Sequence, residues 1–563
     1  MLVNFLKTVL LLLLGFVISH LITAWGIAIF SHKAFSANYP FSLVNVYLRN
    51  LLNLKSLSGF FHVFFWFYLV ATIIPLEIYR IFFEEDFKNS KNKYGFAKFA
   101  SAKTIKKMGL TSKDGIVFGL IRRNFLQKIL HQKKIIKSNQ PLSSLIIAPT
   151  GTGKTAGFII PTLKSINNSV VIFDIKGELY NKTSATRAKL GQKIFILDVE
   201  EGNIKFNPFA KNQLPQNHKK LKSYVKNISN FIFDNQGSSE GGPRKENNYF
   251  VSSAKELFNT LILYLILEDG YTTITQVKEL LLGSNNPKQI FLTIQEKITD
   301  KEAAETDPNK KQLLGQVREG ANQIVQICDA KDQFLGVVGS LTTILAAFDD
   351  LEIKDIIDCE NSSVVAKDLR KEKITVYIRV KDVDLERLRP VISLFFETLI
   401  GDIISNDPAP KDNQITFVLD EFGNLGRISK LIKATTISRS YKLNQIFILQ
   451  DLAQISSIYS KEERSILESN TAYKIILQQN NFDTAKGISE LIGTRTDARI
   501  SKSSKESKKM NDRDSFSVSQ EGIPLISPQD ILNLNKNRCL IVVQGYAANV
   551  ILADIVWYFK YNL

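Results

Sequence analysis

A glycine-rich turn that follows a short apolar run restricts the fold of this chain more than any other feature. The apolar run is Leu145-Ile146-Ile147, which has the composition of a buried strand. The turn consists of Ala148, Pro149, Thr150, Gly151, Thr152, Gly153, Lys154 and Thr155. Because glycine has no Cβ, backbone N–H groups in such a turn can converge on phosphate oxygens. A strand, this turn and a following helix together predict a phosphate-binding loop of a nucleoside triphosphatase.

Two side chains of the turn have expected roles in that interpretation. We expect Lys154 to reach the β- and γ-phosphates of ATP and Thr155 to offer its hydroxyl to Mg²⁺. Ala148 stands where the motif usually has its first glycine. The alternative is a chance Gly/Thr loop before a helix, and an acidic strand much later in the chain argues against it.

That acidic strand is the second feature that predicts chemistry. The apolar run 415–419 ends in Asp420 and Glu421, which places two carboxylates at the edge of a sheet where the phosphate loop also opens. We expect Asp420 to hold the hydration shell of Mg²⁺ and Glu421 to polarise an attacking water. A solvated Asp-Glu pair at a strand end is the alternative, and the presence of the loop around Lys154 makes it less favoured.

Four further residues are weaker candidates. Gln450 ends the next predicted strand, from which an amide can sense a γ-phosphate, although an ordinary strand-end polar residue fits equally. Arg439 precedes that strand and could stabilise charge at the nucleotide of a neighbouring subunit, or could simply be solvated. Asp174 and Glu178 flank a Lys-Gly turn, and their carboxylates would stand beside the nucleotide or belong to a plain connection.

Apolar runs rich in β-branched residues predict the architecture around these sites. They indicate parallel strands in an α/β sheet with helices on both faces. The predicted strands are residues 145–148, 170–174, 194–198, 374–380, 415–419, 446–450, 473–477 and 540–543. We expect one part of the nucleotide-binding core at 141–208 and a second part, with the C-terminal strands, at 371–563. Between them, residues 209–370 read as a mainly helical insertion, and 494–521 as a mobile surface loop.

The N-terminal residues 1–87 predict a membrane anchor. Residues 8–30 carry no formal charge, and a second apolar stretch covers about residues 57–79. Each is long enough to cross a hydrocarbon core of about 30 Å. A cleaved signal peptide is the less favoured alternative for the first stretch. The distribution of Lys and Arg predicts both termini, and the bulk of the chain, on the cytoplasmic side.

Positive charge is concentrated just after the predicted anchor. The net charge of the chain is +17, and residues 88–137 contain 14 Lys or Arg against the single acid Asp114. We therefore expect residues 88–140 to be a basic juxtamembrane segment that attracts DNA phosphates or anionic lipid headgroups. Solubility or the positive-inside rule could account for the same charge. The three cysteines and five histidines are scattered, which predicts neither a disulfide framework nor a zinc site.

With the phosphate loop, Asp420-Glu421 and the two-span anchor taken together, the chain resembles the type IV secretion system coupling proteins of the TraG/TraD conjugation family. The resemblance covers nearly the whole chain. It rests on residues 95–101, 148–155, 174–178, 206–209, 419–426, 450–454 and 524–530. Two positions depart from the family pattern: Ala148 replaces glycine, and Ile175 replaces a common proline.

This resemblance implies a RecA-like P-loop NTPase core with an inserted all-α subdomain, preceded by a two-helix transmembrane anchor in the bacterial inner membrane. It implies a homohexamer that hydrolyses ATP with Mg²⁺ at its subunit interfaces and recruits relaxase–DNA complexes or effector proteins to the channel proteins of a type IV secretion system. Arg439 and Gln450 would be its interface arginine and its sensing glutamine. An ATP-dependent docking platform without motor activity, and an FtsK-like DNA pump, are the alternatives.

Overall fold

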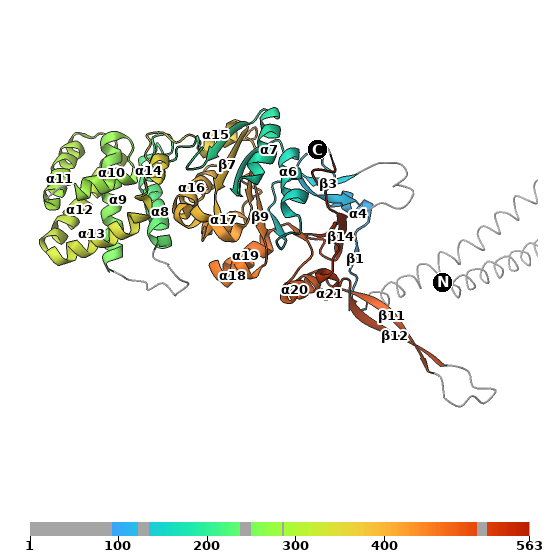
Figure 1. Ribbon diagram of the computed structural model, residues 1–563. Helices are drawn as coiled ribbons and strands as arrows, with labels where there is room; N and C mark the ends of the chain where they lie inside the picture. Colours follow the sequence, from blue (N-terminus) through green and yellow to red (C-terminus); the bar gives the residue numbers. More distant parts are fainter. Residues whose placement is uncertain (1–92, 122–133, 237–248, 284–285, 504–514, 562–563) are drawn as a thin grey trace, which may run out of the picture. The chain divides into compact units, whose positions relative to one another are not determined.

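The computed structural model describes residues 93–121, 134–236, 249–283, 286–503 and 515–561 (Figure 1). The chain divides into two compact units. The first comprises Met1–Phe96 with Thr494–Ile523, and the second comprises Ala97–Gly493 with Pro524–Leu563. The predicted membrane anchor at 1–87, with its spans at 8–30 and 57–79, lies outside the described residues.

A mixed twelve-stranded sheet is the centre of the second unit. Seven of its strands are parallel and lie side by side. In their order across the sheet they are β6 (Lys193–Leu197), β7 (Ile374–Val380), β5 (Ser169–Ile175), β8 (Ile415–Leu419), β9 (Leu443–Leu449), β4 (Ser144–Ile147) and β10 (Tyr473–Ile476). Every residue of β4, β5, β8 and β9 is buried, because the helices of an α/β fold cover both faces of a parallel sheet. The predicted α/β class is confirmed.

The sheet continues beyond β10 with antiparallel strands. They are β13 (Arg538–Val543), β14 (Asn549–Asp554), β2 (Ile116–Ile121) and β3 (Ile135–Ser138). The prediction that 540–543 is a parallel strand is therefore wrong. An apolar run shows that a strand is buried on both faces, but it carries no information about the direction in which the strand pairs.

The basic segment 88–140 contributes directly to this sheet. It contains β1 (Lys98–Phe99), which pairs with β14, the short helix α4 (Ala102–Lys107), and strands β2 and β3. The run Ile116–Ile121 is almost wholly buried, although basic residues surround it in the sequence. The many basic residues of this segment drew attention away from the apolar run 116–121, and the sequence analysis did not predict a strand there.

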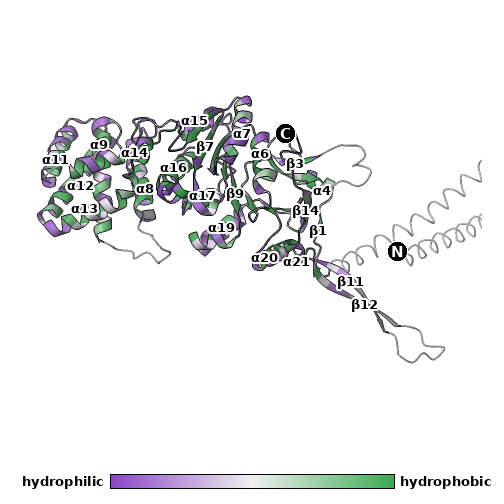
Figure 2. Ribbon diagram, viewed as in Figure 1, coloured by the Kyte–Doolittle hydropathy of each residue, from purple (hydrophilic) through white to green (hydrophobic). Residues whose placement is uncertain are grey.

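The first unit contains a two-stranded sheet where the sequence predicted a mobile loop at 494–521. Strand β11 (Thr494–Ser503) pairs with β12 (Ser515–Pro524). Both strands are mostly hydrophilic in Figure 2, which is why hydrophobic content did not reveal them. Thr494 also donates its hydroxyl hydrogen to the carbonyl oxygen of Tyr94 at 2.6 Å. Backbone pairing between the two strands, rather than apolar burial, forms this element.

Helices fill the chain between β6 and β7 (Figure 1). They are α8 (His218–Gln236), α9 (Tyr249–Asp269), α10 (Ile274–Leu282), α11 (Pro287–Ala304), α12 (Pro308–Asp329), α13 (Lys331–Leu345), α14 (Leu351–Ile357) and α15 (Ala366–Lys371). Their buried side chains form one continuous apolar core with one face of the sheet. These helices therefore do not have a separate hydrophobic core of their own.

Helix α9 is both long and apolar. Among the described residues it is the one helix that is long and apolar enough to cross a membrane, and a second candidate arises only if the bent pair Lys331–Phe348 and Leu351–Ile357 is counted as one span. More than half of the most apolar window of α9 is buried, at 56%. Its hydrophobicity is therefore accounted for by packing against α8, α12 and α13.

Asn207 ties the helical insertion to the sheet. Its buried side-chain amide donates to the carbonyl oxygens of Thr272 at 2.8 Å, between α9 and α10, and of Cys359 at 2.7 Å, just after α14. The backbone N–H of Phe206 donates to the carbonyl oxygen of Ile356 at 2.8 Å. Residues 206–209, one of the motifs behind the family resemblance, are thus the point where the chain leaves the sheet and to which it returns.

A mostly buried carboxylate in α16 (Leu385–Ser405) makes the stability of the second unit dependent on pH. Burial raises the pKa of Asp402 to about 7, and the Lys430 ammonium and the Gln213 amide oppose this shift only in part. The native state therefore retains a proton that the unfolded chain loses near pH 4. The stabilisation from this proton is complete below about pH 4 and is lost as the pH rises to about 7, by about 1.4 kcal/mol per pH unit at most.

We predict that Asp402→Asn removes this dependence. The variant and the wild-type protein should unfold at similar temperatures at pH 4, and the variant should be the more stable at pH 8, in thermal unfolding followed by circular dichroism. The exposed Asp407→Asn is the matched control and should follow the wild type at both pH values. A difference between Asp402→Asn and wild type that stays constant from pH 4 to pH 8 would contradict the assignment.

Candidate functional site

The loop predicted to bind phosphate leaves the carboxyl end of β4 and curls back on itself. Gly151 and Gly153 adopt left-handed backbone conformations, with φ of 77° and 87°. The hydroxyl of Thr152 closes the turn by donating to the carbonyl oxygen of Pro149 at 2.6 Å. Ala148 is completely buried, and its N–H donates to the carbonyl oxygen of Leu449 at 2.8 Å. Its methyl group is part of the core, so the missing first glycine leaves the loop intact.

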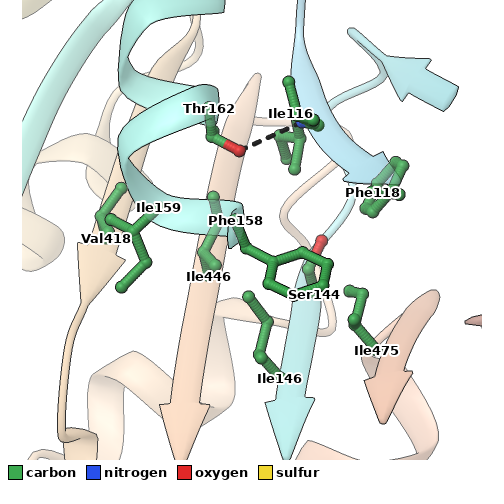
Figure 3. A pocket seen from close by; sticks show the side chains of 11 residues that line it. Ile116, Phe118, Ser144, Ile146, Phe158, Ile159, Thr162, Val418, Ile446 and Ile475 are labelled. Carbon is green, nitrogen blue, oxygen red and sulfur yellow. Dashed lines mark hydrogen bonds between the residues drawn. The ribbon is translucent and has the colours of Figure 1, made fainter. Parts of the chain in front are cut away.

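The chain after Lys154 forms a π-helical turn, Thr155–Ile159, and then helix α6 (Ile160–Ser165). Figure 3 shows how this segment packs: Phe158 and Ile159 face apolar side chains of the sheet, around a small cavity that Ile146 and Ile446 also line. The hydroxyl of Thr162 accepts the backbone N–H of Val117 at 3.1 Å. Strand β2, from the basic segment, thus holds the helix behind the loop in place.

Lys154 connects the loop to the acidic strand. Its ammonium nitrogen lies 3.4 Å from a carboxylate oxygen of Asp420 and 3.3 Å from one of Glu421. Strand β9 lies between β4 and β8, so the long lysine side chain spans the end of an intervening strand. The Lys154 side chain is only 10% exposed, and those of Asp420 and Glu421 are 12% and 19% exposed. The two carboxylates therefore neutralise a nearly buried cation.

The two acids differ in environment. Burial raises the pKa of Asp420, while the charge of Lys154 lowers it and that of Glu421 raises it further. The Asp420 oxygen that lies 3.4 Å from the Lys154 ammonium is buried, and no hydrogen bond of good geometry satisfies it among the described residues. Glu421 adopts a left-handed backbone conformation, with φ of 54°, and its second oxygen accepts the side-chain amide of Asn424 at 3.1 Å. Asn424 therefore fixes the direction of the Glu421 carboxylate.

Asp174 lies beside these acids at the end of β5, the strand next to β8. Phe173 is in register with Leu419, which brings Asp174 level with Asp420. Its two oxygens accept the backbone N–H groups of Leu179 at 3.1 Å and Tyr180 at 2.8 Å, at the start of α7 (Glu178–Lys189). Burial raises the pKa of Asp174 to about 6, with a contribution from the charge of Asp420. Asp174 therefore holds the helix and also adds negative potential to the site.

The remaining predicted residues are at different places. Thr155 is half-buried at the first position after Lys154, and Gln450 is half-buried directly after β9, at the same edge of the sheet. The backbone N–H of Gln450 donates to the side-chain oxygen of Gln454 at 3.2 Å. Arg439 is exposed and precedes β9, at the opposite edge. Seven strand residues, about 20 Å, separate it from the loop edge, so it lies away from the other candidates.

Two contributors at this edge escaped the sequence analysis. Asn424 lay within the quoted motif 419–426, but its contact with Glu421 depends on the turn after β8. The Trp557 ring packs against Gly153 from about 400 residues further along the chain. No local pattern could have indicated that contact.

The loop 148–155 and the acids beside it can bind phosphate, together with a metal ion that the phosphate also holds. Within the described ranges, no group of three or more His, Cys, Asp or Glu side chains could bind a metal by itself. The buried Asp420 oxygen that faces Lys154 and the Thr155 hydroxyl suit a cation such as Mg²⁺, which usually takes only one or two protein ligands and completes its shell with phosphate and water. The residues present therefore fit a metal–triphosphate complex.

Comparisons with known proteins agree with this chemistry. A family model described as "Type IV secretory system Conjugative DNA transfer" matches residues 98–562. "Protein VirD4" of Agrobacterium fabrum is 27% identical over 407 residues, which are 72% of this chain and 57% of that protein. "Conjugal transfer protein TraG" of Escherichia coli is 22% identical over 554 residues, 92% of this chain and 81% of that protein. This chain spans about three fifths of the length of the VirD4 relatives it matches.

Solved structures show the same fold. The unbound "bacterial conjugative coupling protein TrwBdeltaN70" aligns with a TM-score of 0.54 and 16% identity, over 82% of this chain and 94% of that one. A second structure, titled "Plasmid coupling protein TrwB in complex with ADP and Mg2+", aligns with a TM-score of 0.52 and 16% identity, over 82% and 93%. At this identity the likeness concerns the fold alone.

The two left-handed glycines of the loop provide a matched pair of variants. A Cβ on Gly151 would meet no atom within 4 Å, whereas a Cβ on Gly153 would lie 2.3 Å from the Trp557 ring. Both Gly→Ala changes carry the left-handed penalty of about 1–2 kcal/mol, and only Gly153→Ala adds overpacking of about 1–3 kcal/mol. We therefore expect Gly153→Ala to lose more unfolding free energy in urea titrations. Equal losses would show that Trp557 does not pack on the loop.

Proposed function

This chain belongs to the type IV secretory system conjugative DNA transfer family, and on that basis we propose that it is an inner-membrane ATPase of a type IV secretion system. It recruits DNA–protein complexes or effector proteins to the secretion channel and powers their translocation. The observation that carries the ATPase proposal is the contact of Lys154, in a glycine-rich loop, with Asp420 and Glu421 at 3.4 and 3.3 Å. The TrwB complex with ADP and Mg²⁺ supports ATP and Mg²⁺ as the ligands.

The binding step follows from the charges. A triphosphate brings several negative charges to the loop, and the Lys154 ammonium exchanges its carboxylate partners for phosphate oxygens. The backbone of residues 148–155 would surround the phosphates, and Thr155 with Asp420 would hold Mg²⁺, which would supply positive charge to neutralise them. Once Lys154 is drawn to phosphate, Asp420 loses its nearest cation, which leaves its carboxylate available to a metal ion.

The hydrolytic step uses Glu421. Asn424 directs its carboxylate, which accepts a proton from the attacking water, and Gln450 at the neighbouring strand end orients that water or senses the γ-phosphate. Asp174 remains a positioning residue, because both of its oxygens are occupied by backbone N–H groups of α7. Lys154 would offset the negative charge that develops on the β-phosphate of the departing ADP, and bound Mg²⁺ would supply further positive charge there.

The assembly around this site is also part of the proposal. Arg439 lies at the far edge of the sheet from the loop, so it serves the nucleotide of an adjacent subunit in a homohexamer. The two predicted spans hold each subunit in the membrane, and the basic segment 88–140 supplies sequence-independent contacts to DNA. The channel proteins and the relaxase–DNA complex or effector proteins are its partners.

We predict that Glu421→Gln abolishes ATP turnover and leaves ATP binding intact, because the amide keeps the shape of the side chain but cannot accept the proton. The loss in turnover should be at least 100-fold. Lys154→Ala should weaken ATP binding itself. Phosphate release measures turnover, fluorescent nucleotide titration measures binding, and the exposed Glu490→Gln is the control.

The same variants test the motor in the cell. Conjugation or effector secretion should stop with Glu421→Gln. If transfer continues at the wild-type rate while turnover is lost, the protein is a docking platform that uses ATP only to assemble, and the motor proposal fails. Normal ATPase activity in Lys154→Ala would show that the loop does not bind the triphosphate.

The position of Arg439 predicts complementation between subunits. Arg439→Ala should lose turnover by at least about 100-fold, because an arginine finger stabilises transition-state charge. Mixed with Lys154→Ala, it should regain part of the wild-type rate, since a Lys154→Ala subunit supplies Arg439 to an intact loop next to it. Full activity of Arg439→Ala alone, or no recovery in the mixture, would exclude the role across the interface.

A further inference from the structure

The last described residues of the chain cross the outer side of the phosphate loop. We name residues 555–559, which directly follow β14, the C-terminal strap. The backbone N–H of Tyr558 donates to the carbonyl oxygen of Ala156 at 3.1 Å. The indole N–H of Trp557 donates to the side-chain oxygen of Asn537 at 3.1 Å, and the N–H of Ile555 donates to the carbonyl oxygen of Asn537 at 2.9 Å. The strap is thus attached both to the loop helix and to the start of β13.

Two glycines make room for the strap. A Cβ on Gly153 would lie 2.3 Å from the Trp557 ring, and a Cβ on Gly157 would lie 2.3 Å from a methyl group of Ile555. Such distances are far below van der Waals contact, so any other residue at either position would displace the strap. Gly153 therefore serves two purposes, because it forms the loop and also admits the indole ring.

The strap leaves aromatic surface open beside the loop. The rings of Trp557 and Phe559 stack with centroids 5.7 Å apart and an angle of 30°. Trp557 is half-buried, and Phe559 is 63% exposed. Tyr558, between them in the sequence, lies under the ammonium of Lys164 and meets Phe559 edge to face at 5.4 Å, and the Lys560 ammonium lies 6.0 Å from the centre of the Phe559 ring. An exposed stacked pair of large aromatic rings next to a loop built for phosphate points to a planar ligand group.

We propose that Trp557 and Phe559 form the wall against which the base of the bound nucleotide stacks; this inference rests on the proposed function. The two sides of the loop differ in chemistry. On the side of β9 and β8 lie Asp420 and Glu421, whose charges suit a metal and a water. On the side of β13 and β14 lies the aromatic pair. A neutral, flat base is stabilised by the rings and not by the carboxylates.

Stacking sets a particular kind of nucleotide preference. Every base has a π-face, so aromatic stacking discriminates by ring size rather than by hydrogen-bond pattern. The wall should therefore favour purine over pyrimidine triphosphates, accept ATP and GTP with similar affinity, and contribute nothing to the binding of inorganic tripolyphosphate.

Binding measurements on the full-length protein in detergent test the wall. Trp557→Ala combined with Phe559→Ala should bind ATP about 10- to 100-fold more weakly, with the affinity for tripolyphosphate unchanged. Tyr249→Ala, which removes an exposed aromatic ring of the helical insertion, is the matched control and should bind both ligands as the wild type does. Equal weakening of ATP and tripolyphosphate binding would overturn the wall and leave the strap with a purely structural role.

A second measurement keeps the Trp557 side chain in place. The chain has three tryptophans, so Trp25→Phe with Trp66→Phe leaves Trp557 as the sole indole fluorophore. ATP should quench its emission, and tripolyphosphate should not. If ATP binds without changing the emission, or if both ligands change it equally, the stacking wall is wrong. The ATPase proposal is unaffected by either result. If neither ligand binds to the wild-type protein, the ATPase proposal itself fails.

Discussion

A lysine ammonium that is almost removed from water requires anionic partners, and the order of the strands places two of them beside Lys154. The side chain is 10% exposed, and the carboxylates of Asp420 and Glu421 lie at 3.4 and 3.3 Å. An unpaired charge at this depth would cost several kcal/mol. The pair therefore holds the loop after β4 against the turn after β8, across the end of β9. When a triphosphate binds, the simplest response of this site is that Lys154 leaves the carboxylates of Asp420 and Glu421 and pairs with phosphate oxygens.

A second buried cation serves structure in a different manner. Arg187 is fully buried, and it donates to the carbonyl oxygens of Leu163, Ile166 and Asn168 and to the hydroxyl of Thr375. Burial lowers its pKa to about 10. Arg187 belongs to α7, and its acceptors are neutral groups at the end of α6, just after that helix, and on β7. Four hydrogen bonds to neutral groups therefore hold its guanidinium in one place. Lys154 differs because its partners are ions, which a stronger ligand can replace.

Local chemistry explains what could be predicted from the sequence. The loop 148–155 and the Asp420-Glu421 pair were recognisable because glycine spacing and an apolar run ending in acids are properties of adjacent residues. The parallel strands from β4 to β10 were recognisable by the same argument. The antiparallel direction of β13, the strand character of 116–121 and the β11–β12 pair were not. An apolar run does not give the direction of pairing, basic residues surround 116–121, and the hydrophilic β11 and β12 (Figure 2) have no apolar pattern.

The sequence by itself determined which reactive groups the protein carries: a phosphate loop with Lys154, a carboxylate pair, a strand-end glutamine and an arginine before β9. Only the tertiary structure decided which of them meet. Sheet order brings Asp174 level with Asp420, leaves Arg439 at the opposite edge, and places Trp557 on Gly153. The physical reason is that side-chain contacts across a sheet follow from the order and direction of strands, and packing of the whole core selects these. No short window of residues contains that information.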